Sequence, residues 1–381
     1  MGNWCLRRVA SRLSVWTLLL LLCLPAAGYA VESAGRGEAE EFDPASMVFS
    51  HIYDAYEWHV FAIGDFHLTI PLPVMLISRE GTGFHCFSSS RFEGGRAVYD
   101  NFAVRVGKGA EAKPRIVELD ASGKELSAPI DLSMTKNVVA ILFSCLLMLW
   151  VFIAAARAYR PDRPSAPHGL QNAVELMVIF VRDQVARVAL PAQKVDRYLP
   201  FLLTVFFFIL FNNILGLVPF FPAGASVTGN LTVTGTLALF TFLVTNLSGN
   251  RHYWRDIFNT PGMPIFMKLP VPMMPAVELM GIFIKPIVLM VRLFANMLAG
   301  HMVTLVLMSL IFLLGGIAAA AGYAISVISV AFGIFMILLD LLVSLVQAYV
   351  FALLSAVYIG MATEEPEHAG KEPVRAELLA K

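Results

Sequence analysis

The stretch that decides the fold is Lys285-Pro-Ile-Val-Leu-Met-Val-Arg292-Leu-Phe-Ala-Asn296-Met-Leu-Ala-Gly300-His301. It places an arginine, an asparagine and a histidine in a run that is otherwise as apolar as a membrane helix. Arginine keeps its charge at any ordinary pH, and a charge at bilayer depth costs about 2.5–3.5 kcal/mol even on a lenient insertion scale. The stretch therefore predicts a membrane helix in which Arg292 has either a partner or a task.

The composition agrees with a chain that lies largely in a membrane. Of its 381 residues, 57% are hydrophobic and only 15% are charged. Several apolar runs reach the length of about 20 residues that a helix needs to cross a bilayer. The net charge is zero, so the overall charge does not favour nucleic acid as a partner. We expect an all-α polytopic membrane protein without a disulfide framework.

Residues 1–30 have the pattern of a secretory signal peptide. Arginines precede a short apolar core, Trp16–Leu24, and small residues end the segment near Ala30. A first membrane span is the alternative, and the short core argues against it. A lipoprotein site at Cys23 is less favoured, because leucines flank this cysteine where small residues would be expected. Cleavage would leave the new N-terminus outside the cytoplasm.

Residues 31–135 contain no spanning run and predict a small extracytoplasmic (periplasmic) region. The stretches His67–Ile77 and Pro114–Leu119 favour short β-strands between glycine-containing turns. The region also holds several potential metal ligands, whose spacing matches no standard ligand pattern. We therefore expect surface histidines and neither a metal nor a cofactor. The potential ligands are His51, His59, His67, His85 and Cys86.

About five helices are expected to cross the membrane. The first is Asn137–Ala156, and the three arginines that follow it place its end in the cytoplasm by the positive-inside rule. The second is Leu199–Val218 and the third is Leu231–Leu247. Residues 168–190 favour an amphipathic helix at the membrane surface.

The last two apolar stretches, Met274–Leu314 and Ala324–Met361, are too long for upright spans. At about 1.5 Å per residue, each would reach about twice the thickness of the hydrocarbon core. Each must break, for which Pro275 and Pro286 offer positions in the first, or lie strongly tilted. We expect two long, strongly tilted helices. The expected parts of the chain are a signal peptide at 1–30, an extracytoplasmic region at 31–135, a membrane domain at 136–364 and a cytoplasmic tail at 365–381.

Charged and titratable residues are few in these two stretches. Because each helical residue turns by about 100°, Asn296 shares a face with Arg292, whereas His301 points the opposite way. A structural ion pair of Arg292 with Glu278 or Asp340 is the alternative to a functional role.

The final stretch carries a polar stripe within about 60° of helical angle. Hydrogen bonds between helices would explain such a stripe, and we favour that explanation for Ser344. A buried carboxylate at Asp340 needs a cation, a proton or water. A fixed cation at Arg292 with titratable His301 and Asp340 suits proton transfer, since the arginine would discharge a mobile carboxylate and block a leak. The stripe comprises Asp340, Ser344, Gln347, Phe351 and Tyr358.

At these residues the sequence resembles subunit a of the F-type ATP synthase membrane sector. The family motif Arg-Leu-Phe-(Ala/Gly)-Asn-Met-x-Ala-Gly-(Glu/His) is matched by Arg292–His301, and the glutamine motif of the last helix by Gln347–Phe351. The resemblance covers about residues 137–364.

The resemblance implies that Arg292 is the essential cation facing the ring of c subunits, with Asn296 and Gln347 beside it. Many members carry a glutamate where this chain has His301 and a histidine where it has Asp340, so acid and base are exchanged between two helices. We expect these two residues, with Glu278 and Ser344, to relay protons.

The expected function is that of a proton-translocating stator subunit with two half-channels, which is not an enzyme by itself. The chain has no phosphate-binding loop that would bind ATP. Expected partners are the c-ring, the b-subunit peripheral stalk, the rest of the ATP synthase and the lipid bilayer of a bacterial inner membrane. The expected C-terminus is cytoplasmic.

The alternative function is a stand-alone proton- or sodium-coupled secondary transporter. Such folds often contain internal repeats, and the sequence holds no second copy of the Arg292 motif. A passive scaffold would not explain Arg292, His301 and Asp340 together. The coupled ion stays open between proton and sodium.

Overall fold

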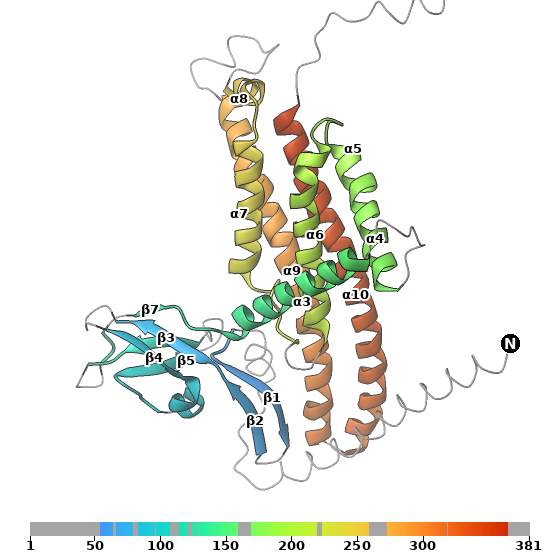
Figure 1. Cartoon of the computed structure of the whole chain (residues 1–381). Helices are drawn as coiled ribbons and strands as arrows, with labels where there is room; N and C mark the ends of the chain where they lie inside the picture. The colour runs from blue at the N-terminus through green and yellow to red at the C-terminus, as the bar shows by residue number, and fades with distance from the viewer. Residues whose placement is uncertain are drawn as a thin grey trace, which may run out of the picture. The chain divides into compact units, whose positions relative to one another are not determined.

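The computed structural model describes residues 54–63, 66–78, 83–95, 97–106, 114–120, 124–126, 128–158, 169–218, 223–258, 273–317 and 319–364 (Figure 1). The predicted signal peptide at 1–30 and the predicted cytoplasmic tail at 365–381 lie outside these residues. The chain divides into two compact units. The first comprises Met1–Ile141, Leu217–Ala225 and Ala299–Leu339, and the second comprises Leu142–Gly216, Ser226–Leu298 and Asp340–Lys381.

The β-strands of the first unit form small antiparallel sheets. This confirms the short strands predicted at His67–Ile77 and Pro114–Leu119. In one sheet β3 lies between β4 and β7, and the other pairs are β1 with β2 and β5 with β6. The strands are β1 (Glu57–Ile63), β2 (Phe66–Pro71), β3 (Pro73–Ile77), β4 (Phe84–Ser88), β5 (Phe102–Val106), β6 (Pro114–Glu118) and β7 (Ile130–Asp131).

One face of β3 supplies the core of this β region. Val74 and Leu76 alternate with exposed or half-buried neighbours and are fully buried. They pack with Phe92 of the short helix η1 (Ser89–Gly95), and with Phe102 and Ile116 of the β5–β6 pair. Alternation with period two is what a strand shows when one face meets a core.

Helix α3 (Lys136–Ala158) confirms the helix predicted at 137–156. Its first turn is hydrogen-bonded to the β region, since Lys136 N donates to Ala55 O over 3.0 Å and Asn137 N to Asp54 Oδ1 over 3.1 Å. Just before the helix, Met134 N donates to Pro73 O over 3.1 Å. The connection from the sheet to α3 is therefore short and held by backbone hydrogen bonds.

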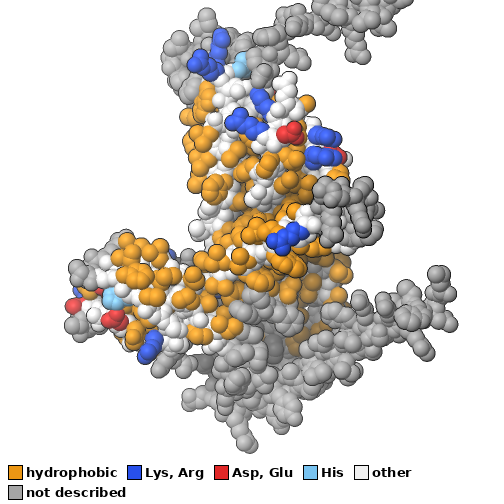
Figure 2. All heavy atoms as spheres, in the orientation of Figure 1, with side chains coloured by type: hydrophobic (Ala, Val, Ile, Leu, Met, Phe, Trp, Pro, Cys, Tyr) orange, Lys and Arg blue, Asp and Glu red, His pale blue; other side chains and the backbone are white. Residues whose placement is uncertain are grey.

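The second unit is a helical bundle that contains the amphipathic segment predicted at 168–190. This segment is helical from Leu170 to Ala189 and includes a π-helical turn, η3, whose Val181, Val185 and Ala186 are fully buried. Its position at the membrane surface stays a prediction. Hydrophobic side chains cover most of the visible bundle, with Lys and Arg near one end (Figure 2). The helices before residue 260 are α4 (Leu170–Phe180), η3 (Val181–Ala186), α5 (Arg187–Ala189), α6 (Val195–Leu217), α7 (Leu231–Leu247) and α8 (Arg251–Phe258).

Helices α9 (Met273–Ile317) and α10 (Ala319–Thr363) have 45 residues each. Neither is broken among the described residues, and α9 continues through Pro286. The break that we considered for these stretches is therefore wrong, and their tilt stays a prediction. Among the described residues, α3, α6, α9 and α10 are long and apolar enough to cross a membrane. Helix α7, the third of the five predicted spans, is apolar over 17 residues, and its crossing stays a prediction.

The core of the bundle joins α6 to the last two helices. Leu202 and Phe206 of α6 are fully buried with Leu293 of α9 and Phe351 of α10. Where α10 passes α5 there is no room for a side chain, because a Cβ added at Gly360 would lie 2.1 Å from Ala189 O. Small residues allow helices in membranes to approach closely in this way.

The C-terminal end of α10 is held by side chains from two other segments. Lys194 Nζ donates a hydrogen bond of 2.6 Å to Thr363 O, and Asn250 Nδ2 donates one of 3.1 Å to the same oxygen. The backbone N–H of Asn250 also donates to Ala362 O over 3.0 Å. These bonds satisfy carbonyls that the end of a helix leaves without an intrahelical partner.

Candidate functional site

Arg292 lies on the exposed side of α9. The neighbouring Leu289 and Leu293 turn inward and are fully buried, whereas Val288 and Val291 are exposed like the arginine. Among the ion pairs of the described residues, none includes Arg292. The pair with Glu278 or Asp340 that we considered is therefore not formed. The geometry presents a cation on an otherwise apolar surface.

Beside this cation, a hydrogen bond joins the two long helices. Asn296 Nδ2 of α9 donates to Gln347 Oε1 of α10 over 3.0 Å. Asn296 is exposed on the face of Arg292, and Gln347 is only 4% exposed. The structure thus brings together two of the predicted site residues and leaves Arg292 one helical turn away from their contact.

The polar stripe of α10 is largely turned into the bundle. Ser344 is fully buried and Asp340 is half-buried. The Ser344 hydroxyl donates to the backbone carbonyl of Asp340 over 2.7 Å, within the same helix. The hydrogen bond between helices that we favoured for Ser344 is therefore wrong. Such a bond is instead placed at Ser355, whose hydroxyl lies 3.3 Å from Thr241 Oγ1 of α7.

His301 belongs to the first unit, in the later part of α9. Its ring is half-buried, and its Nε2 is enclosed without a hydrogen-bond partner among the described residues. Buried polar atoms usually have a partner, so an unpaired ring nitrogen is suited to water or an exchanging proton. Glu278, by contrast, is exposed near the beginning of α9.

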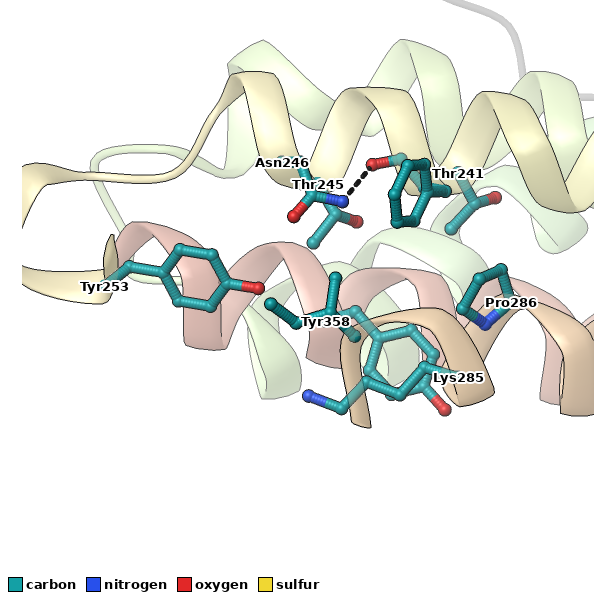
Figure 3. A pocket seen from close by; sticks show the side chains of 9 residues that line it. Thr241, Thr245, Asn246, Tyr253, Lys285, Pro286 and Tyr358 are labelled. Carbon is teal, nitrogen blue, oxygen red and sulfur yellow. Dashed lines mark hydrogen bonds between the residues drawn. The ribbon is translucent and has the colours of Figure 1, made fainter. Parts of the chain in front are cut away.

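A second polar site, which the sequence analysis did not predict, lies between α7, α8, α9 and α10 (Figure 3). It is a pocket with an empty volume of about 330 Å³. Lys285 reaches over the ring of Tyr358, with 5.4 Å between Nζ and the ring centre. Two atoms of α7, Thr245 Oγ1 and Asn246 Oδ1, are buried without a hydrogen-bond partner among the described residues.

The pocket is electrostatically linked to Glu278. Burial, together with the nearby Glu278 carboxylate, raises the pKa of Tyr253, which lines the pocket from α8. The buried side of α7 offered a signal for this site, because Thr234, Thr241 and Thr245 repeat at helical spacing.

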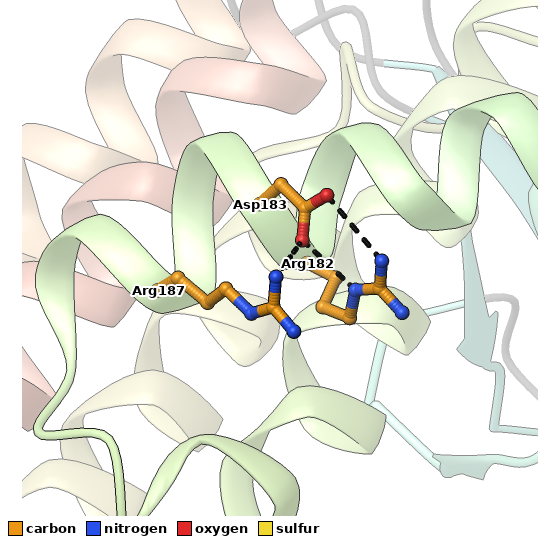
Figure 4. Close-up of polar contacts among 3 residues, drawn as sticks. All are labelled: Arg182, Asp183 and Arg187. Carbon is orange, nitrogen blue, oxygen red and sulfur yellow. Dashed lines mark hydrogen bonds and ion pairs between the residues drawn. The ribbon is translucent and has the colours of Figure 1, made fainter.

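An ion-paired cluster marks the surface of the π-helical turn (Figure 4). Asp183 accepts from Arg182 Nε over 2.9 Å and lies 2.9 Å from Arg187 Nη1. The hydrogen bond from Arg182 holds the pKa of the Asp183 carboxyl below its ordinary value. The cluster leaves one net positive charge on the surface.

The β region shows no metal centre among the residues that the structure describes, since no three potential ligands lie together there. His85 contacts Asp100 instead, with 2.5 Å between Nδ1 and Oδ2.

Comparison with known proteins gives two family matches. A family model described as ATP synthase A chain matches residues 138–360, and one described as Domain of unknown function (DUF8433) matches residues 47–137. The chain is 43% identical to ATP synthase subunit a of Myxococcus xanthus, over 68% of this chain and 83% of that protein. It is 42% identical to ATP synthase subunit a of Chloroherpeton thalassium, over 62% of this chain and 69% of that protein. It is 32% identical to ATP synthase subunit a 2 of Chlorobaculum tepidum, over 94% of this chain and 85% of that protein.

Proposed function

This chain belongs to the ATP synthase A chain family and is a multi-pass subunit of the membrane sector, in which we propose that it is the stationary proton-conducting subunit beside the rotating c-ring. Two half-channels would lead protons to and from the ring, and Arg292 would separate them. In this arrangement the chain binds no nucleotide. Family membership argues against the stand-alone transporter that the sequence left open.

The observation that carries the proposal is the exposure of Arg292 on an apolar face without an ion pair among the described residues. Facing lipid, this charge would cost about 2.5–3.5 kcal/mol. A carboxylate presented by a c subunit would offset that cost, because an opposite charge favours the ionised form of both groups. An approaching protonated carboxyl would lose its proton next to the arginine, and this release is the step that couples ion flow to rotation.

Asn296 and Gln347 would keep this surface polar without adding charge. Their hydrogen bond ties α9 to α10 next to Arg292, so the cation is presented from two linked helices. A linked pair holds the distance between Arg292 and the ring more constant than a single helix would.

One half-channel would use the pocket of Lys285, Tyr253 and Tyr358, which has unpaired buried oxygens for water and lies in the electrostatic range of Glu278. The other would use His301, Asp340 and Ser344 as relay groups. His301 has an enclosed ring nitrogen without a partner among the described residues, as a proton-exchanging group needs.

The direction of the chain in the membrane follows from charge. With the arginines at and just after the end of α3 and the basic residues of α8 on the cytoplasmic side, the β region would be periplasmic and the C-terminus cytoplasmic in a bacterial inner membrane. The b-subunit stalk would then contact the cytoplasmic side. A membrane potential supplies about 2.3 kcal/mol per charge per 100 mV, so rotation would need many protons passed one at a time.

The experiment that tests the proposal measures ATP-driven proton uptake by inverted membrane vesicles that contain the assembled complex. We expect Arg292→Ala and Arg292→Lys to abolish uptake, the latter because a lysine presents a different charge geometry. Arg251→Lys, at an exposed arginine of α8, is the matched control and should pump normally. Pumping by Arg292→Ala at the rate of the control would refute the proposal.

The relay assignment is tested separately in the same vesicles. We expect His301→Ala and Asp340→Ala each to lower the pumping rate while the complex still assembles. If both variants pump at the unmodified rate, the relay is wrong even where Arg292 proves essential.

A further inference from the structure

The β region carries an apolar surface that its own core does not use. Strand β3 is apolar at every position, Pro73-Val-Met-Leu-Ile77, which is typical of a strand covered on both faces. Val74 and Leu76 meet the core, but Ile77 on the other face is 37% exposed. Something outside the β region is therefore expected to cover that face.

The neighbouring strands extend this exposed face. Ile77 is paired with Phe84 of β4 on one side and with Ile130 of β7 on the other, and directly paired residues point to the same face of a sheet. Phe84 is 61% exposed and Ile130 is 47% exposed. Leu132, two residues after Ile130, is 56% exposed. We call these four residues the β3 patch, and Figure 2 shows hydrophobic side chains gathered where β3 and β7 lie.

The β3 patch is tied to the beginning of a membrane helix. Leu132 N donates to Met75 O over 3.0 Å, so the edge of the sheet runs on toward α3. Only three residues, Ser133 to Thr135, separate Leu132 from Lys136, where α3 begins, and the four Cα-to-Cα steps between them span at most about 14 Å. The hydrogen bonds of Lys136 N and Asn137 N to the β region remove what freedom this short connection had.

The distances suit the boundary of a bilayer. Paired strands lie about 4.8 Å apart, so the patch is only about 10 Å wide from β4 to β7. Surface-bound apolar faces enter the boundary of headgroups and acyl chains to a depth of about 5–10 Å. An aromatic side chain such as Phe84 is well suited to that zone.

We propose that the β3 patch docks the extracytoplasmic β region onto the surface of the same bilayer that α3 enters. The occupant is lipid, because the connection to α3 keeps the patch within reach of the membrane boundary in every molecule. Docking would fix the first turn of α3 against the β region. This role is independent of the proton pathway.

Cys86 provides a native probe, because it lies exposed on the patch face of β4, two residues from Phe84. We would label it with a bimane fluorophore in the full chain, assembled in its complex in phospholipid vesicles, with the remaining cysteines replaced. The matched control carries the label at Arg105→Cys with Cys86→Ser, on the separate β5–β6 sheet where the Arg105 side chain is 57% exposed. Lipids with brominated acyl chains and aqueous iodide serve as the two quenchers.

We expect brominated lipid to quench the label at position 86 and iodide to quench the label at position 105. Quenching of both labels by iodide alone would place the patch in water and overturn the proposal. Protection of position 86 from both quenchers would mean that protein covers it, namely another subunit, a second copy or residues 31–53, and would also overturn the proposal. Phe84→Asp, at an exposed position, should transfer the label at position 86 from lipid quenching to iodide quenching, and unchanged lipid quenching would contradict insertion of Phe84.

Discussion

The two regions of the molecule leave opposite kinds of group uncovered. The apolar bundle exposes a cation, Arg292, and the polar β region exposes an apolar face around Ile77. Each group is out of place in the solvent that surrounds most of its region, and each therefore marks a contact with something else. In our proposals, a carboxylate of a c subunit would pair with the cation, and lipid would cover the apolar face. The difference shows that an exposed residue is most informative about function where its polarity is opposite to that of the surface around it.

Two neighbouring residues of β3 should show the largest difference between a covered and an uncovered apolar side chain. Leu76 is fully buried and Ile77 is not, although both are large and apolar. We expect Leu76→Ala to destabilise the β region by about 2–5 kcal/mol through loss of burial and a cavity. Ile77→Ala should change its folding stability little. Hydrogen exchange of the β region in the whole protein measures both, and equal losses would mean that Ile77 belongs to the core.

A second comparison contrasts packing inside the bundle with its surface. Gly360→Ala forces a Cβ toward Ala189 O, and we expect a loss of about 1–3 kcal/mol from overpacking. Gly281→Ala on α9 is the control, because a Cβ there meets nothing within 4 Å. Thermal unfolding of the purified protein in detergent compares the two. If Gly281→Ala loses as much stability as Gly360→Ala, the loss comes from the change in the helix backbone and not from contact with α5.

The hydrogen bond beside Arg292 should contribute less. Asn296→Ala, Gln347→Ala and the double variant form a cycle, and we expect a coupling of about 0.5–1.5 kcal/mol in stability. Pumping should fall in both single variants, because the presentation of Arg292 loosens. Additive losses in the cycle would show that the two side chains do not support each other.

The smallest effect is expected at the surface cluster of the π-helical turn. Arg182 lowers the pKa of the Asp183 carboxyl below its ordinary value of 3.8. The pair therefore stabilises the fold above that pH, and this contribution disappears as pH falls through the lower pKa of the folded state. The Asp183→Asn variant should therefore unfold at a slightly lower temperature than the unmodified protein at neutral pH. In strong acid the two unfolding temperatures should be the same. A difference that grows on acidification would have the wrong sign for this pair. Exposed pairs of this kind contribute little.

Much of the helical framework could be predicted from the sequence, because apolar length is a strong signal. The helix at Leu231–Leu247 and the strand at Pro114–Glu118 lie where the pattern predicted them. The continuity of α9 through Pro286 could not be read in this way, since proline interrupts one hydrogen bond and neighbours decide whether the helix continues.

The candidate site was predictable where residues on one helix share a face. Helical angle placed Asn296 beside Arg292, but it could not reveal that Asn296 bonds Gln347, which is 51 residues away along the chain. For the same reason Tyr253 and Lys285 were not connected, because they come from different helices and meet only through tertiary packing. The hydroxyl of Ser344 was misassigned, since a serine in a helix can satisfy itself on the preceding turn.

The hydrogen bonds at the end of α10 have a mechanical consequence. In the proposed arrangement, a c-ring that turns against α9 and α10 would push these helices sideways with a force equal to the one that drives it. Lys194 and Asn250 hydrogen-bond to the last turn of α10 from two separate segments. That force would therefore be shared with the rest of the bundle instead of bending α10 alone. Without these hydrogen bonds, α10 would bend at each step of rotation. The complex would then lose coupling between proton flow and rotation under load, while protons could still pass.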